Sequence, residues 1–121
     1  MQNESLEFVL NRIENLLSIY ITDKDGVMVM KACSKDMPAK LLEPSFTASF
    51  LLSSEQLSKV NLGENKSIIC RFDDYDIVQF KYHQFVLNLI AKNGANIGMM
   101  LAVGKELEEF MNVLSRELIN I

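Results

Sequence analysis

The chain contains a single histidine, His83, and only two cysteines, Cys33 and Cys70. One histidine excludes a metal site built from several imidazoles, and we expect His83 to be a surface or strand-kink residue rather than a catalytic base. The cysteines lie far apart and form no CxxC pair. We expect both to be reduced, buried thiols of an intracellular protein, rather than a disulfide or a reactive thiol.

The chain also has no excess of basic residues. It carries 12 lysines and arginines against 16 aspartates and glutamates, which gives a net charge of −4. Binding of nucleic acid requires a basic face, and none is visible in the sequence, so the charge argues against this class of function. Direct docking onto anionic lipid is disfavoured for the same reason.

Long apolar runs are missing, because no stretch approaches the roughly 20 residues that a membrane-spanning helix needs. Residues 1–5 carry no positive charge ahead of the first apolar residues, so no secretory signal is expected. Gln2 excludes myristoylation, and the C-terminal residues contain no cysteine for prenylation. We therefore expect a cytosolic protein that attaches to a membrane only through a partner.

The chain is nevertheless long and apolar enough to fold as one domain over residues 1–121. Apolar residues make up 49% of it and charged residues 23%, an ordinary balance for a soluble globular protein. A domain of this size buries about two thirds of the surface that its unfolded chain exposes. No internal repeat or linker divides the sequence.

The first half of the sequence predicts a helix, a hairpin and a second helix. Apolar residues at helical spacing indicate an amphipathic first helix, namely Leu6, Val9, Leu10, Ile13 and Leu17. Alternating residues 17–22 and 27–31 flank Gly26, which can adopt the positive φ of a tight hairpin turn. The second helix should begin at Pro44 and run to about Asn61.

The second half predicts three more strands and a last helix. We expect strands at residues 66–72, 75–91 and 97–103, joined by turns at 73–74 and 92–96, followed by a helix with Glu106, Glu108 and Glu109 in its first turn. The order is α-β-β-α-β-β-β-α. This is an α/β (α+β) fold: a five-stranded antiparallel sheet with the first and third helices on one face and the second on the other.

The strand at residues 66–72 is expected at a sheet edge. An apolar edge strand exposes unpaired backbone groups and needs a covering or pairing element. The second helix is rich in small residues, which either allow another backbone to approach closely or are simply solvated: Thr47, Ala48, Ser49, Ser53, Ser54 and Ser58. Together these features favour a protein partner over a substrate.

Motifs that would indicate catalysis fail on their spacing. Five residues separate Gly98 from Gly104, whereas a phosphate-binding loop has four, and Glu106 stands where a serine or threonine must bind magnesium. A calcium loop centred on Gly26 would place Ile21 and Ala32 where carboxylates are required. Asp73, Asp74 and Asp76 are interpreted as a solvated turn. No catalytic, cofactor-binding or metal-binding residue is expected.

The order of elements resembles the roadblock family of small dimerising adaptors. Within that family the chain is similar to the MEK-binding scaffold subunits of the Ragulator (late endosomal and lysosomal adaptor) complex. The resemblance spans essentially the full length and rests on the segments Asp23-Lys24-Asp25-Gly26-Val27, Pro44-Ser45-Phe46, Gln56-Leu57-Ser58-Lys59, Asn65-Lys66-Ser67-Ile68-Ile69-Cys70, Val78-Gln79-Phe80, Ala95-Asn96-Ile97-Gly98 and Lys105-Glu106-Leu107.

The resemblance implies a scaffold without enzymatic activity. It also implies that the second helix and third strand of this chain pair with the same elements of a sister roadblock subunit. This pairing would form one continuous sheet across the heterodimer. The implied partners are Rag GTPases, the target-of-rapamycin kinase complex and MEK and ERK kinases, with a separate lipidated subunit as membrane anchor. The implied location is the cytosolic face of late endosomes and lysosomes.

Two other classes of function stay open from the sequence. One is a self-dimerising roadblock protein that regulates a small GTPase or a motor, and the other is a small-molecule sensor or enzyme of similar shape. Homodimerisation of the purified chain would distinguish a self-dimerising roadblock protein from a heterodimeric scaffold subunit. The residues expected at the protein interface are Leu51, Ser54, Leu57, Ser58, Lys66, Ser67, Ile68, Ile69, Cys70, Arg71 and Phe72.

Overall fold

The protein is described from a computed structural model that covers residues 2–42, 44–60, 62 and 66–119. Its elements follow the chain in the order α1 (Gln2–Arg12), β1 (Leu16–Asp23), β2 (Met28–Cys33), the 3-10 helix η1 (Ala39–Leu42), α2 (Pro44–Ser58), β3 (Ser67–Arg71), β4 (Tyr75–Tyr82), β5 (Phe85–Lys92), α3 (Ile97–Glu106) and α4 (Glu108–Ile119). The five strands form one antiparallel sheet in the order β2-β1-β5-β4-β3.

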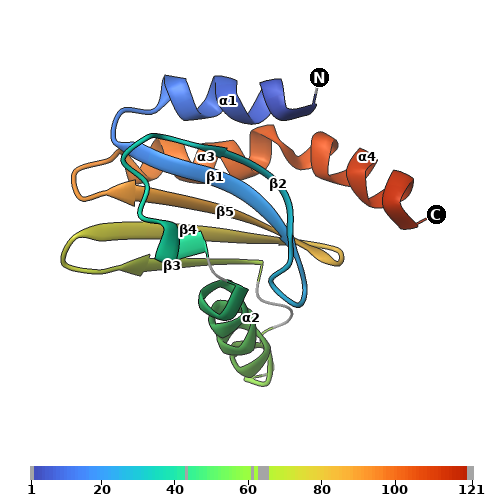
Figure 1. Cartoon of the computed structure of the whole chain (residues 1–121). Helices are drawn as coiled ribbons and strands as arrows, with labels where there is room; N and C mark the ends of the chain where they lie inside the picture. Colours follow the sequence, from blue (N-terminus) through green and yellow to red (C-terminus); the bar gives the residue numbers. More distant parts are fainter. Residues whose placement is uncertain (1, 43, 61, 63–65, 120–121) are drawn as a thin grey trace.

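Helices cover both faces of this sheet, as the sequence predicts (Figure 1). On one face, α1, α3 and α4 enclose the main core, to which β1 and β5 contribute alternate residues such as Ile19, Ile21, Leu87 and Leu89. On the other face, η1 places Leu41 over a smaller cluster with Tyr20, Ile77 and Ile90. α2 lies below this second face, beside β3 (Figure 1).

The predicted β1–β2 hairpin is confirmed. Gly26 has φ +85°, the conformation that only glycine adopts without strain. The carboxylate Oδ1 of Asp23 accepts the N–H groups of Asp25 and Val27 at 2.8 and 3.0 Å. These bonds fix the turn, so the carboxylate of Asp23 serves the hairpin rather than a cation.

The predicted long strand at residues 75–91 is wrong, because the chain reverses at His83 and Gln84. β4 ends at Tyr82 and pairs with β5, which begins at Phe85. His83 adopts φ +56°, in the left-handed region that a two-residue hairpin turn requires. The single predicted strand is therefore two strands in the sheet.

The predicted strand at residues 97–103 is also wrong, since these residues form α3. The side chain of Asn96 caps this helix by accepting the N–H of Met99 at 3.1 Å. Burial follows a helical rather than an alternating period, with Met100, Val103 and Leu107 inside and Leu101 exposed. Residues 75–91 form one strand more than predicted and residues 97–103 form one fewer. The sheet therefore still has the five strands predicted.

The boundaries of the remaining helices differ slightly from those expected. α2 ends at Ser58, and Asn61, the predicted end, lies outside the described residues. Glu106 belongs to the end of α3, whereas Glu108 and Glu109 occupy the first turn of α4 as expected. Arg12 at the end of α1 binds the Glu106 carboxylate, with Nη1 2.8 Å from Oε1, and this contact lowers the pKa of Glu106.

Candidate protein interface

β3 is an edge strand whose outer backbone groups face away from the sheet. The N–H of Phe72 donates to the Tyr75 carbonyl at 2.8 Å, and the N–H of Lys81 donates to the Lys66 carbonyl at 2.9 Å. Because such bonded pairs alternate along an antiparallel ladder, the register directs the N–H and C=O groups of Ser67, Ile69 and Arg71 outward. These groups form a free donor and acceptor row along the edge.

The side chains of β3 alternate between the two faces of the sheet. Ile69 lies opposite Val78 on the face that carries α3 and α4, and it is 44% exposed. Ile68 and Cys70 are half-buried on the opposite face. Burial raises the pKa of the Cys70 thiol, so this group is held in its neutral form and is not an activated nucleophile.

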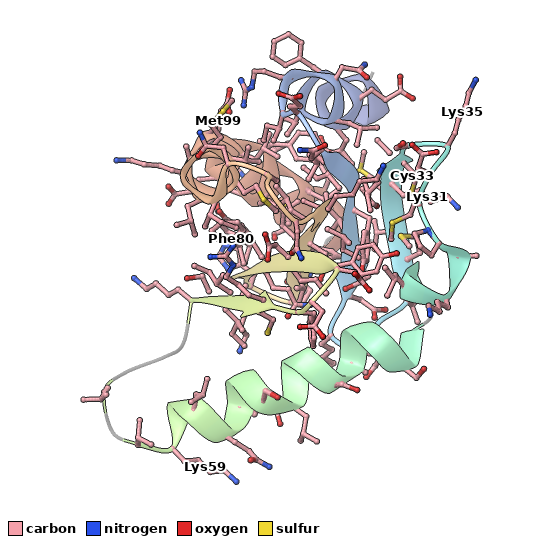
Figure 2. All side chains as sticks on the ribbon, turned by 90° about the vertical axis from the view of Figure 1, so that its left-hand side faces the viewer. Lys31, Cys33, Lys35, Lys59, Phe80 and Met99 are labelled. Carbon is pink, nitrogen blue, oxygen red and sulfur yellow. The ribbon has the colours of Figure 1, made fainter. Side chains whose placement is uncertain are left out.

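α2 adds exposed apolar side chains next to this edge. Leu52 and Leu57 are 59% and 52% exposed, and Val60 and Leu62, which follow the helix, are 57% and 89% exposed. Figure 2 shows α2 below the sheet, with Lys59 just past its C-terminal end. The large side chains along this segment therefore lack a covering layer in the described part of the chain.

The serines of α2 are in part satisfied by their own helix. The hydroxyl of Ser49 donates to the Ser45 carbonyl at 2.9 Å, and that of Ser53 donates to the Ser49 carbonyl at 3.2 Å. Such bonds leave a small, nearly apolar surface, because the hydroxyl hydrogens point back to the backbone. A second helix can pack closely on a surface of this kind without stranding polar groups.

The predicted interface residues fall on these two elements. Those with described side chains are exposed or half-buried, and none is fully buried: Leu57, Lys66, Ser67, Ile68, Ile69, Cys70, Arg71 and Phe72. Leu51, Ser54 and Ser58 lie on α2, but their side chains are outside the described part of the structure. The predicted interface did not include Leu52, Val60 or Leu62, because an apolar residue in this segment gives no sign in the sequence of whether it faces its own core or a partner.

One polar contact at the β3 edge differs from the expected solvated turn. Asp73 and Asp74 are exposed in the turn, but Asp76 is completely buried. Its Oδ1 accepts a hydrogen bond from Nε of Arg71 at 3.2 Å, and Arg71 itself is mostly exposed. Cross-strand pairing of residues 71 and 76 therefore anchors the outer strand to its neighbour.

The described residues do not assemble a reactive centre at this surface. His83 is exposed, and its Nε2 lies 3.2 Å from Oδ1 of Asn112. Residues 98–105, which resembled a phosphate-binding loop, lie inside α3. Among the described residues, no group of three or more histidine, cysteine or acidic side chains could hold a metal ion, and no helix is long and apolar enough to cross a membrane.

Solved structures share this fold. The roadblock/LC7 domain from Streptomyces avermitilis superimposes with a TM-score of 0.70 at 14% identity, and the alignment covers 97% of each chain. The gliding protein MglB from Thermus thermophilus superimposes with a TM-score of 0.80 at 15% identity, covering 96% of this chain and 89% of MglB. These likenesses confirm the predicted roadblock fold.

Sequence comparison gives a closer relation. The chain is 39% identical to the Ragulator complex protein LAMTOR3 of Tetraodon nigroviridis, over 88% of this chain and 86% of that protein. It is 38% identical to LAMTOR3 of Mus musculus, over 87% and 88% of the two chains. The profile of the family described as "Mitogen-activated protein kinase kinase 1 interacting" matches residues 2–118. The resemblance predicted from the sequence is confirmed, and this chain belongs to the mitogen-activated protein kinase kinase 1 interacting family.

Proposed function

We propose that this chain is a non-catalytic scaffold subunit of a Ragulator complex, which forms a heterodimer with a sister roadblock protein. In this role it helps to recruit Rag GTPases, the target-of-rapamycin kinase complex and MEK and ERK kinases. The assembly lies on the cytosolic face of late endosomes and lysosomes, held there by a separate lipidated subunit. The names of the LAMTOR3 relatives support membership of such a complex.

The main observation in favour of a heterodimer is the open edge of β3 beside the exposed apolar side chains of α2. Three residues of β3 direct backbone donors and acceptors outward, and an antiparallel strand of a partner could pair with all of them. Leu52 and Leu57 would supply apolar area next to this strand. A strand and a helix from each subunit can supply the roughly 1,200–2,000 Å² that a stable interface buries.

The chemistry of the described residues supports a scaffold rather than an enzyme. The raised pKa of the Cys70 thiol opposes nucleophilic catalysis, and the exposed His83 pairs with an amide rather than with a nucleophile or an acid. The buried carboxylate of Asp76 serves the structure, since it binds Arg71. The function proposed for these residues is therefore to form a surface that binds another protein.

Affinity purification of the tagged chain, followed by quantitative mass spectrometry and native mass spectrometry, tests this proposal. We expect one roadblock-fold protein of similar size to be recovered in a 1:1 ratio with the chain. Native spectra of the reconstituted pair should show a heterodimer. A stable homodimer that does not exchange with any co-purified roadblock protein would contradict the proposal and favour a self-dimerising regulator of a GTPase or a motor.

A further inference from the structure

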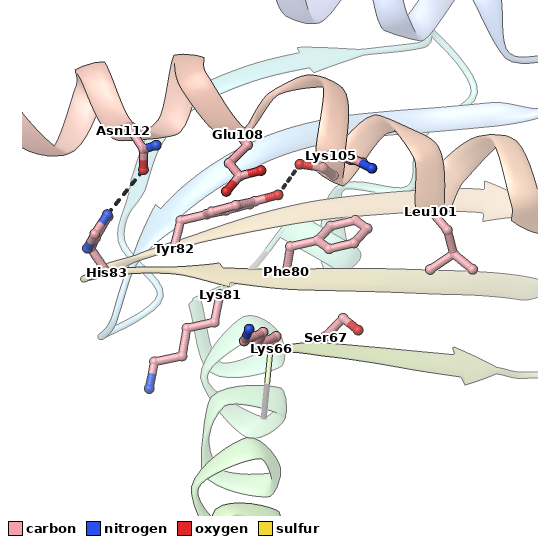
Figure 3. Close-up of a pocket in the computed structure, with 11 residues that line it drawn as sticks. Lys66, Ser67, Phe80, Lys81, Tyr82, His83, Leu101, Lys105, Glu108 and Asn112 are labelled. Carbon is pink, nitrogen blue, oxygen red and sulfur yellow. Dashed lines mark hydrogen bonds between the residues drawn. The ribbon is translucent and has the colours of Figure 1, made fainter. Parts of the chain in front are cut away.

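A second surface lies on the helical side of the sheet, where β3 and β4 meet α3 and α4. An open groove of about 900 Å³ runs between these elements. In Figure 3 the rings of Phe80 and Tyr82 rise from β4 toward the helices, and Leu101 reaches down from α3. Phe80 is half-buried and Leu101 is 37% exposed, so the groove has an apolar floor that is open to solvent.

The shape of this floor depends on one glycine. A Cβ placed on Gly104 would lie 2.3 Å from Cε1 of the Phe80 ring, so the ring packs directly on the backbone of α3. The hydroxyl of Tyr82 donates a hydrogen bond to the carbonyl of the same glycine. Two aromatic side chains of β4 are thus fixed against one turn of α3, which makes the groove a preformed feature rather than a gap between loose side chains.

The rim of the groove is basic, although the chain as a whole carries a net charge of −4. Lys66 and Lys105 are exposed at its opposite sides, and Lys81 is exposed on β4 with its side chain directed away from the helices (Figure 3). Within the described residues the ion pairs join other groups, and none involves these three lysines. The charges of Lys66 and Lys105 are therefore available to a partner in the groove, whereas Lys81 points away from it.

Two further groups limit what the groove can accept. Glu108 faces Tyr82 inside the groove, and burial together with this carboxylate raises the pKa of the Tyr82 hydroxyl. A carboxylate in this place repels any anionic group that enters beside Tyr82, so the acidic side chains of a ligand must lie near the lysines at the rim. Glu108 and Asn112 can instead accept hydrogen bonds from backbone N–H groups, which a polypeptide supplies and a lipid headgroup does not.

We propose that this groove docks an acidic segment of a partner polypeptide, with an apolar side chain against Phe80 and Leu101 and carboxylates near Lys66 and Lys105. An apolar centre with a charged rim is the usual composition of such a contact, and charge complementarity then selects the partner. The groove lies on the helical face rather than along the outer edge of β3. Although Lys66 and Ser67 also lie at the edge proposed to contact the sister subunit, the groove is open in the isolated chain, so the inference goes beyond the proposed heterodimer and is tested on the chain alone.

The test uses the full chain and a fluorescent synthetic peptide in which a central Phe-Leu pair is flanked on both sides by glutamates. We expect saturable binding that weakens as salt is raised. Lys66→Glu and Lys105→Glu should each weaken it about fivefold, and the double variant more than about tenfold, since each removes an attraction and adds a repulsion. Lys35→Glu makes the same charge change far from the groove (Figure 2) and should leave binding unchanged.

Two controls make the result specific. A peptide with glutamines in place of the glutamates should bind more weakly, and each variant should keep the melting temperature of the parent. The proposal is overturned if the acidic peptide does not bind, or if Lys35→Glu weakens binding as much as the groove variants do. It is also overturned if the two groove lysines are needed to bind phosphatidylserine vesicles but not the peptide.

Discussion

Replacement of Ile69 by proline should abolish stable association with the sister subunit while the chain itself stays folded. The N–H of Ile69 points away from β4, so proline removes no hydrogen bond within this chain. It removes a donor in the middle of the proposed inter-subunit strand pair and introduces a ring that obstructs the approaching strand. The combined loss should weaken binding about 100-fold or more.

The neighbouring residue provides a matched control for this change. Ile68 bonds inward to Gln79, so Ile68→Pro should unfold the edge of the sheet in the isolated chain, whereas Ile69→Pro should not. Ile69→Val keeps the donor and should bind almost as tightly as the parent. Light scattering after size exclusion measures association, and circular dichroism measures folding. A folded Ile69→Pro variant that binds normally would exclude β3 from the interface.

Substitution of Gly104 by alanine should destabilise the fold by about 1–3 kcal/mol. In an exposed helix the same change stabilises by roughly 1 kcal/mol, so the expected sign is reversed. The reason is steric, because the new Cβ would lie within 2.3–2.6 Å of three atoms of the Phe80 ring. The ring must then rotate or α3 must move off the sheet.

Two variants separate this clash from a general effect of alanine. Gly98→Ala lies in the same helix and brings Cβ only to 3.2 Å from Oδ1 of Asn96, so its effect should be much smaller. Phe80→Leu should relieve the clash, so the double variant with Gly104→Ala should be less destabilised than the sum of the two single changes. Urea unfolding of the parent and the four variants measures these differences. Additive effects would show that Phe80 and Gly104 do not constrain each other.

The sequence predicts the local turns and the layers of this fold well. Gly26 and the alternation around it indicate the first hairpin, and Pro44 indicates the start of α2. The edge position of β3 follows from an apolar strand that leads into a two-residue turn. These features depend on short-range physical rules, namely φ preferences, helix starts and side-chain periodicity.

Two elements could not be predicted because local patterns are ambiguous there. Residues 97–103 contain four bulky residues at alternate positions, which fits a strand, yet their methionines, leucine and alanine also favour a helix. The Asn96 cap and the packing of Met100 and Val103 against the core decide for the helix. The turn at His83 needs a positive φ from a residue that rarely adopts one, so it leaves only a weak signal in the sequence.

The two candidate surfaces also differ in how far short-range sequence rules predict them. The β3 edge could be predicted from one strand, whereas the groove brings together Lys66, Phe80 and Lys105 from three elements. Its floor also depends on contact between Gly104 and a ring distant in the sequence. Exposure of Leu52 could not be read from periodicity, since an apolar residue looks the same whether its partner lies in its own chain or in another.

Amide hydrogen exchange measured by NMR, on the chain alone and with its sister subunit, tests the central claim most directly. The amides of Ser67, Ile69 and Arg71 point outward and should exchange rapidly in the isolated chain. In the heterodimer their exchange should slow by at least about tenfold, while the inward amides of Ile68 and Cys70 change less. If the sister subunit binds and these three outward amides still exchange at their free rates, the two subunits do not pair through β3.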